Sequence, residues 1–182
     1  MSLGDSKTQG QDWQAALANG LQLGSGVGFA RYDAGVSAID TATMATSIVG
    51  IMAGFAPESP ETSVRFVAYN LGVNDVFNGV LPNETTWKTN TLAILDAVNA
   101  RYPNAAIYLM RPWKRGQGTA FDTMAGWVAD VVALRAFAHL GPDERVWLAN
   151  GDDGATLTQD GIHPNAAGRL VERAVWQAAM GY

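Results

Sequence analysis

The segment VRFVAYNLGVND, residues 64–75, joins an apolar run to a short polar turn. Val, Phe, Tyr and Leu dominate residues 64–71, as expected of a strand that is buried on both faces of a parallel sheet. Gly72, Asn74 and Asp75 follow at once. In open α/β sheets, ligands bind at the carboxyl ends of the strands. The segment therefore predicts a central strand that ends at a functional edge.

Similar apolar runs recur along the chain and alternate with helical patterns. Further strands are predicted at residues 105–110 and 146–149, with a weaker one at 27–32 and a very short one before Gly4. Helices are predicted at residues 9–18, 39–53, 85–102, 121–140 and 165–180. This alternation predicts an α/β fold. We expect a three-layer α/β/α sandwich with a flavodoxin-like, mainly parallel sheet of about five strands and helices on both faces.

Composition narrows the classes of function. No repeat, charge block or Pro/Ser-rich linker divides the 182 residues, so we expect a single domain over residues 1–182. A net charge of -5 argues against a nucleic-acid partner. The chain has no cysteine, which excludes disulfides and a cysteine nucleophile but no cellular compartment. The longest apolar stretch, near residues 48–56, is too short to span a bilayer.

The sequence offers two histidines as a general base. His139 lies in a run that ends at Gly141 and Pro142, where a histidine favours the negative end of a helix. His163 precedes Pro164, which keeps it out of a helix, and Asp160 stands three residues earlier. A carboxylate at that distance can accept a hydrogen bond from the imidazole and fix its tautomer. The alternative is that Asp160 only caps a turn.

A nucleophile for such a base is present near the start of the chain. Ser6 follows Gly4 and Asp5 where a short strand meets the helix predicted to begin near Gln9. Its hydroxyl would lie at the carboxyl edge of the sheet, and its amide could donate to an oxyanion. Ser6 is equally well placed to be a helix N-cap, and a lone Gly-Asp-Ser block does not decide between the two roles.

Four short blocks, taken together, resemble the SGNH (GDSL-like) hydrolase family. They are Gly4-Asp5-Ser6, Gly35, Gly72-Val73-Asn74-Asp75 and Asp160-Gly161-Ile162-His163, each after a predicted strand and in the family's order. The resemblance implies a serine ester hydrolase that needs no cofactor or metal. Lys7 departs from the leucine that family members often carry, and the first strand is unusually short.

The same resemblance assigns roles to the residues in these blocks. Ser6 would be the nucleophile, His163 the general base and Asp160 its partner. The oxyanion hole would consist of the amides of Ser6 and Gly35 and the side-chain amide of Asn74. Asn74 carries a donor that does not titrate, and Gly35 has no side chain to obstruct an acyl oxygen. Taken singly, Asn74 and Gly35 would be ordinary turn residues.

The substrate is predicted from the loop after the strand at 105–110. This loop holds Trp113 and Arg111 among further cations and glycines, a set suited to stacking a sugar ring and bonding its hydroxyls. We expect deacetylation of a carbohydrate or similar small ester. The family also includes lipid-ester and thioester hydrolases. In the alternative interpretation Trp113 packs over the core edge and the cations are solvated.

Two other classes of function are compatible with the residues. Metal-dependent hydrolysis would use the hard ligands Asp5, Asp152, Asp153, Asp160 and His163. A sugar-binding module with a degenerate active site would draw on the six tryptophans, although every triad residue is present. A phosphate-binding flavodoxin-like domain lacks its glycine-rich loop.

Overall fold

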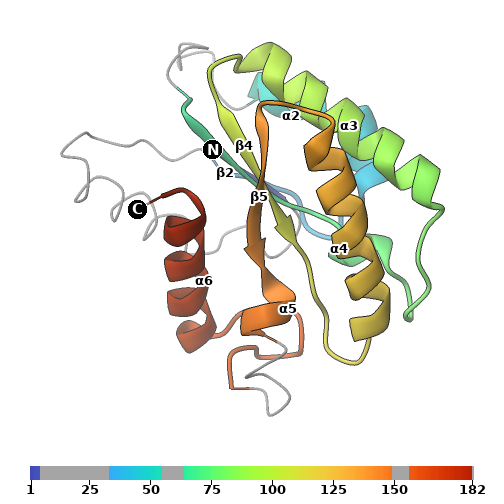
Figure 1. Cartoon of the computed structure of the whole chain (residues 1–182), viewed down its shortest axis with the longest axis vertical. Coiled ribbons are helices and arrows are strands. Elements are labelled where there is room, and N and C mark those ends of the chain that lie inside the picture. The colour runs from blue at the N-terminus through green and yellow to red at the C-terminus, as the bar shows by residue number, and fades with distance from the viewer. Residues whose placement is uncertain (5–32, 55–63, 149–155, 182) are drawn as a thin grey trace.

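Parallel strands lie side by side in the order β2-β1-β3-β4-β5 in the computed structural model, which describes residues 1–4, 33–54, 64–148 and 156–181 (Figure 1). The strands are β1 Ser2–Gly4, β2 Asp33–Gly35, β3 Phe66–Asn70, β4 Ala106–Arg111 and β5 Ala138–Asp143. This is the flavodoxin-like strand order, in which the chain builds outward from β1 in both directions. The predicted fold class is confirmed.

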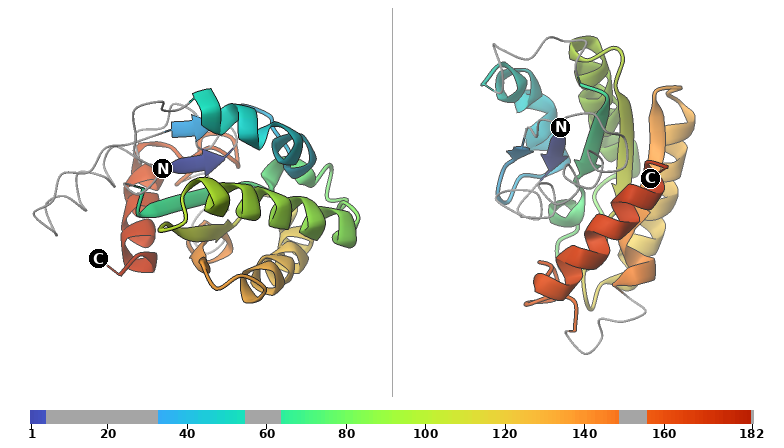
Figure 2. Two further views of the ribbon diagram at one scale, coloured as in Figure 1. Left: turned by 90° about the horizontal axis from the view of Figure 1, so that it is seen from above. Right: turned by 90° about the vertical axis from the view of Figure 1, so that its left-hand side faces the viewer.

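Helices cover both faces of this sheet (Figure 2). They are α2 Thr41–Gly54, α3 Glu84–Arg101, α4 Gly118–Ala133, α5 Glu144–Trp147 and α6 Ala166–Ala179, with a 3-10 turn η1 at Val73–Asp75. In the views of Figures 1 and 2, α2, α3 and α4 lie on one side of the sheet and α6 on the other.

The two faces follow from the alternation of side chains along the central strands. On β3, Val67 and Tyr69 enter the larger core beneath α2, α3 and α4, whereas Phe66 and Ala68 point to the α6 side. On α6, Trp176 is fully buried against that second face. Because both faces are covered, the strands read as continuous apolar runs in the sequence.

Helix α3 agrees closely with its predicted form. Asn83 caps its start by accepting a hydrogen bond from the backbone N of Thr86 at 3.0 Å. The predicted apolar face is buried and consists of Trp87, Thr91, Ile94, Leu95 and Val98. The helix ends at Arg101, two residues before Pro103.

Two elements predicted between residues 121 and 149 were wrong. The helix predicted at 121–140 ends at Ala133, and the edge strand β5 follows, so that His139 lies on a strand. β5 is the last strand of the sheet, so backbone groups along its outer side need no strand partner and a proline is tolerated there. Its residues 139 and 140 are exposed. In place of the strand predicted at 146–149, residues 146 and 147 belong to the helix α5 and Leu148 is its C-cap, while residue 149 lies outside the described residues. Asp143 caps the start of α5 by accepting from Arg145 N at 3.0 Å.

Several predictions fall on residues that the structure does not describe. These are the helix at 9–18, the strand at 27–32, and the residues Asp5, Ser6 and Lys7. The predicted short first strand is present as β1, and its Leu3 is fully buried between β2 and β3. Among the described helices, none has the length and apolar character needed to cross a membrane.

Candidate active site

The carboxyl ends of the three strands that carry the family blocks meet at one edge of the sheet. Gly4, the last residue of β1, lies in register with Gly35 of β2 on one side and with Asn70 of β3 on the other. The chain turns outward in opposite directions on either side of β1, which makes this edge the topological switch point where such folds bind ligands. Ser6 comes two positions after Gly4 in the sequence and lies outside the described residues.

A tight turn after β3 holds Asn74 at this edge. Gly72 has φ of 118°, a conformation that side chains rarely adopt. A Cβ at this position would also lie 3.0 Å from Pro112 Cγ and 3.1 Å from Met124 Sδ. Glycine is therefore required twice over, by its backbone angle and by the close approach of the next loop. The 3-10 turn η1 begins directly afterwards and contains Asn74.

Hydrogen bonds join this turn to the loop that follows β2. Asn74 Nδ2 donates to the carbonyl oxygen of Ile39 at 3.0 Å. Asp75 accepts from the backbone N of Thr41 at 3.2 Å and from the Thr41 hydroxyl, and so caps α2. The Gly35 and Asn74 blocks, far apart in the sequence, are thereby tied together. An amide NH2 has two hydrogens, so Asn74, which is exposed, keeps a second donor for a ligand.

The electrostatics of Asp75 fit a structural role. Burial raises the pKa of its carboxyl group above the ordinary value and outweighs the hydrogen bonds from Thr41, which lower it. Sequence reasoning gave Asp75 no role beyond membership of its block. No local pattern could have revealed one, because Asp40 already caps α2 by accepting from Thr43 N at 2.7 Å, and Asp75 lies 34 residues from Thr41.

Asp160 and His163 are in direct contact. His163 Nδ1 lies 2.6 Å from Asp160 Oδ2, and the other carboxylate oxygen accepts from the backbone N of His163 at 2.7 Å and of Ile162 at 3.0 Å. Partial burial alone would raise the pKa of Asp160, but these hydrogen bonds outweigh it and hold the pKa below its ordinary value. The carboxylate is therefore ionised at neutral pH, and its engagement of Nδ1 leaves Nε2 as the second ring nitrogen.

His139, unlike His163, packs against an aromatic ring. Its side chain is exposed on β5, where the imidazole ring lies 5.1 Å from the ring of Tyr108, centroid to centroid. The predicted helix-terminal role is wrong because the residue lies on a strand. On β5 it lies in register with Tyr108 of β4, at the far end of the strand order from β2 and Gly35.

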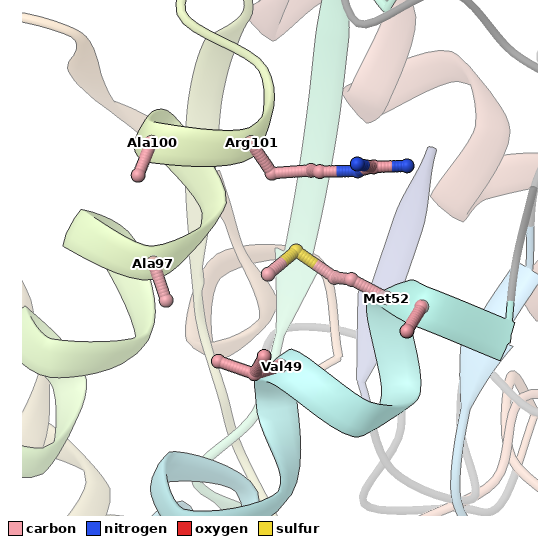
Figure 3. A pocket seen from close by; sticks show the side chains of 6 residues that line it. Val49, Met52, Ala97, Ala100 and Arg101 are labelled. Atoms are coloured by element: carbon pink, nitrogen blue, oxygen red, sulfur yellow. The ribbon is translucent and has the colours of Figure 1, made fainter. Parts of the chain in front are cut away.

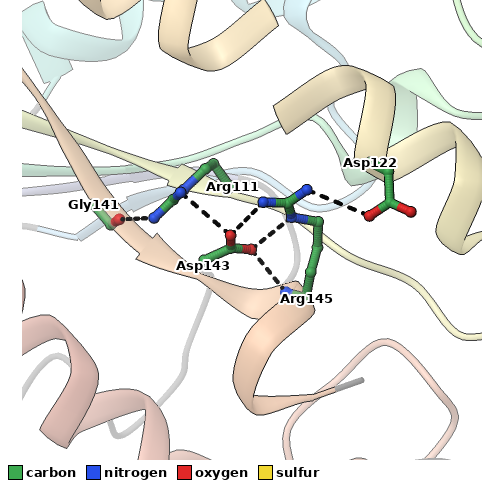
Figure 4. Close-up of polar contacts among 5 residues, drawn as sticks. All are labelled: Arg111, Asp122, Gly141, Asp143 and Arg145. Carbon is green, nitrogen blue, oxygen red and sulfur yellow. Dashed lines mark hydrogen bonds and ion pairs between the residues drawn. The ribbon is translucent and has the colours of Figure 1, made fainter. Parts of the chain in front are cut away.

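The β4–α4 loop has a framework role in the structure. The Trp113 side chain is 5% exposed and its backbone N donates to buried Glu144 Oε2 at 2.9 Å. Arg111 Nη1 lies 3.3 Å from Asp143, which also accepts from Arg145 Nε at 2.8 Å (Figure 4). So small an exposed area favours the packing interpretation of Trp113 over sugar stacking. Arg111 likewise joins β4 to β5.

A metal site is not seen in the part of the chain that is described. No group of three or more His, Asp or Glu side chains gathers among residues 1–4, 33–54, 64–148 and 156–181. Asp5, Asp152 and Asp153, the other acidic ligands of the metal hypothesis, lie outside those ranges.

An apolar pocket lies away from this edge, between the last turns of α2 and α3 (Figure 3). Its lining residues are Val49, Met52, Ala53, Ala97, Ala100 and Arg101. Both helices run back toward the amino ends of the strands, so the pocket faces the opposite edge of the sheet. It brings no nucleophile, carboxylate or histidine together, and it has no part in the proposed chemistry.

Comparison with known proteins decides the family. A model of the GDSL-like lipase/acylhydrolase family matches residues 2–170, which is nearly the whole chain. The chain belongs to the GDSL-like lipase/acylhydrolase family. It is a carboxylic ester hydrolase. Among curated proteins, no sequence matches the chain.

Solved structures share the fold of this acylhydrolase. A family 3 carbohydrate esterase from Talaromyces cellulolyticus has a TM-score of 0.71 at 19% identity, with 96% of this chain and 91% of that chain covered. A psychrotrophic esterase from Pseudoalteromonas sp. gives 0.73 at 18% identity, covering 98% and 94%. An acetyl xylan esterase gives 0.70 at 16% identity, covering 97% of each chain. At these identities the likeness establishes the fold.

Proposed function

We propose that this acylhydrolase is a serine esterase with Ser6 as nucleophile, His163 as general base and Asp160 as the residue that orients the histidine. The observation that carries the proposal is the 2.6 Å contact between His163 Nδ1 and Asp160 Oδ2. An Nδ1–H bonded to a carboxylate leaves the lone pair on Nε2, the form a general base needs. The backbone bonds to Asp160 hold the pair in this arrangement.

The reaction follows from these roles. Ser6 Oγ attacks the ester carbonyl carbon while His163 Nε2 takes the hydroxyl proton. The negative charge on the carbonyl oxygen is stabilised by the amides of Ser6 and Gly35 and by Asn74 Nδ2. The C–O bond to the alcohol then breaks, and the alcohol leaves with the proton from Nε2. Water repeats the sequence on the acyl-serine and releases the carboxylic acid.

The preferred substrate is a short acyl ester, with acetyl on a carbohydrate as the first candidate. Among the proteins of the same fold are a family 3 carbohydrate esterase and an acetyl xylan esterase. This choice now rests on those relatives, because the burial of Trp113 removes the sequence argument for a stacking ring at that position.

A second candidate, a longer acyl chain, is favoured by an apolar turn close to Asn74. Phe77 and Val80 pair in a tight turn, with a backbone hydrogen bond of 2.8 Å from Val80 N to Phe77 O. Their side chains are 76% and 67% exposed. Apolar side chains held at such a site would contact an acyl chain or a lipid alcohol.

A substrate panel separates these candidates. We would measure kcat/KM on acetylated xylo-oligosaccharides and on aryl acetate, butyrate and octanoate esters, with and without a chelator. The proposal expects release of acetate from the sugar and unchanged rates in chelator. Rates that rise steadily toward octanoate, and fall selectively in Phe77→Ala, would establish the second candidate. Complete loss in chelator together with full activity of Ser6→Ala would replace the serine mechanism by metal-dependent hydrolysis.

A further inference from the structure

The loop that carries Asp160 and His163 is held by a residue from another loop. Arg115, between β4 and α4, donates its backbone N to the carbonyl oxygen of Gly161 at 3.0 Å. Its Nη2 also donates to Thr158 Oγ1 at 2.9 Å. The side chain of Arg115 thus contacts Thr158, two residues before Asp160, and its backbone contacts Gly161, directly after Asp160.

Thr158 links Arg115 to the backbone of the loop that contains Asp160. Thr158 is 1% exposed, and its hydroxyl oxygen also accepts from the backbone N of Gly161 at 3.0 Å. A hydroxyl oxygen can accept two hydrogen bonds. The guanidinium of Arg115 and the amide of Gly161 therefore converge on one buried oxygen, which fixes the turn containing Asp160.

Close packing accompanies these bonds. Gly161 has φ of 85°, and a Cβ built on it would lie 3.0 Å from the Cβ of Arg115. Any side chain at position 161 would strain the backbone and push the two loops apart. The glycine inside the Asp-Gly-Ile-His block is thus explained by the approach of Arg115.

The loop that carries Arg115 is itself held in place by hydrogen bonds and ion pairs. Two residues earlier, Trp113 N donates to the fully buried Glu144 at 2.9 Å. At the end of β4, Arg111 pairs with Asp143, which is held in turn by Arg145 (Figure 4). On the far side of the histidine, α6 adds a further support, because Asn165 N donates to Leu157 O at 2.9 Å.

We propose that Arg115 is a positioning residue for the Asp160–His163 pair, acting through Thr158 and Gly161. This inference rests on the proposed function of that pair. Because its bonds are to Thr158 and Gly161, on either side of Asp160, Arg115 acts on the placement of the pair relative to the ester. A displacement of about 1 Å in a catalytic group can cost on the order of a hundredfold in rate.

The first test separates placement from substrate binding. Arg115→Ala should lower kcat on an aryl acetate by about ten- to a hundredfold and change KM by less than about threefold. Thr158→Val, which removes the hydroxyl but keeps the shape, should do the same, whereas Thr158→Ser should recover most of the rate. Arg135→Ala is the matched control, because Arg135 pairs with exposed Asp96 on α3 and should leave kcat unchanged.

The second test is a double-mutant cycle with Asp160→Asn. If Arg115 acts through the pair, Arg115→Ala should cost less than about threefold once Asp160 is already replaced. The same large loss in both backgrounds would overturn the inference, as would equal rates for Thr158→Val and Thr158→Ser. If Arg115→Ala does not fold, the comparison of Thr158→Val with Thr158→Ser tests the inference. Full activity of Ser6→Ala and His163→Ala would instead overturn the proposed function itself.

Discussion

Asp160 binds His163 twice, through the backbone N at 2.7 Å and through Nδ1 at 2.6 Å. The first bond fixes the turn and the second fixes the ring. A carboxylate that did only one of these would leave either the backbone or the tautomer free. The pairing therefore makes Asp160 the residue on which the orientation of the base depends.

Asp160→Asn should lower kcat by about a thousand- to ten-thousandfold while the protein stays folded. An amide can still accept from the backbone, but it does not favour the proton on Nδ1 as a carboxylate does. Steady-state kinetics at neutral pH measure the loss, and the melting temperature checks the fold. Asp96→Asn on α3 is a control for loss of one charge. A decrease of less than about tenfold would show that Asp160 is a turn residue only.

Asn74→Ala should lower kcat by about a hundred- to a thousandfold with little change in KM, because an oxyanion donor acts mainly in the transition state. Asn83→Ala is the matched control. It removes the N-cap of α3 and should cost about 1 kcal/mol of stability without changing kcat. If Asn74→Ala changed KM alone, Asn74 would be a substrate-binding residue and not an oxyanion donor.

Gly72→Ala should destabilise the protein by about 1–3 kcal/mol. The new Cβ would meet Pro112 and Met124 in a backbone conformation that disfavours any side chain. Gly126→Ala in α4 meets no atom within 4 Å and should instead stabilise by about 0.5–1 kcal/mol. Chemical denaturation of both variants measures the two changes. Equal stability of the two variants would contradict the strained turn that holds Asn74.

Asp143 should contribute to the stability of the fold at neutral pH and lose that contribution in acid. Burial raises the pKa of its carboxyl group, but Arg145 and Arg111 outweigh this and hold the pKa below its ordinary value. A lowered pKa in the folded state stabilises the protein above the unfolded value of about 3.9. That contribution is lost as the pH falls through the folded-state pKa.

The corresponding experiment compares Asp143→Asn with the unmodified chain from neutral to acid pH. The variant should lose about 1–2 kcal/mol at neutral pH, and the gap should close as Asp143 protonates. Asp122→Asn, whose carboxylate is exposed, should lose less than about 0.5 kcal/mol at any pH. A gap that stays the same size in acid would rule out the assigned ion pairs as its source.

The interior of the fold could be predicted from the sequence because its patterns are local. β3 and β4 are buried on both faces and so appear as unbroken apolar runs. In α3, apolar residues recur at helical spacing from Trp87 to Val98, and Pro103 marks its end. Such signals depend on neighbours in the sequence and need no knowledge of the fold.

The periphery could not be predicted in this way. β5 lies at the edge of the sheet, so its exposed His139 and Leu140 break the apolar pattern and resemble the end of a helix. The sequence shows Trp113 as an aromatic residue among cations. Its side chain is buried, and its backbone N donates to Glu144, which lies 31 residues away. Arg115 was missed for the same reason, since its partners are at 158 and 161.

Covalent labelling with an aryl phosphonate ester, followed by mass spectrometry of the digested protein, tests directly whether Ser6 is the nucleophile. We expect one adduct, on the peptide containing Ser6, with loss of esterase activity in step with labelling. Labelling should be abolished in Ser6→Ala and strongly slowed in His163→Ala, because the base that activates the hydroxyl is gone. Complete loss of activity with the adduct on another residue, or full activity after Ser6 is labelled, would contradict the role of Ser6 as nucleophile.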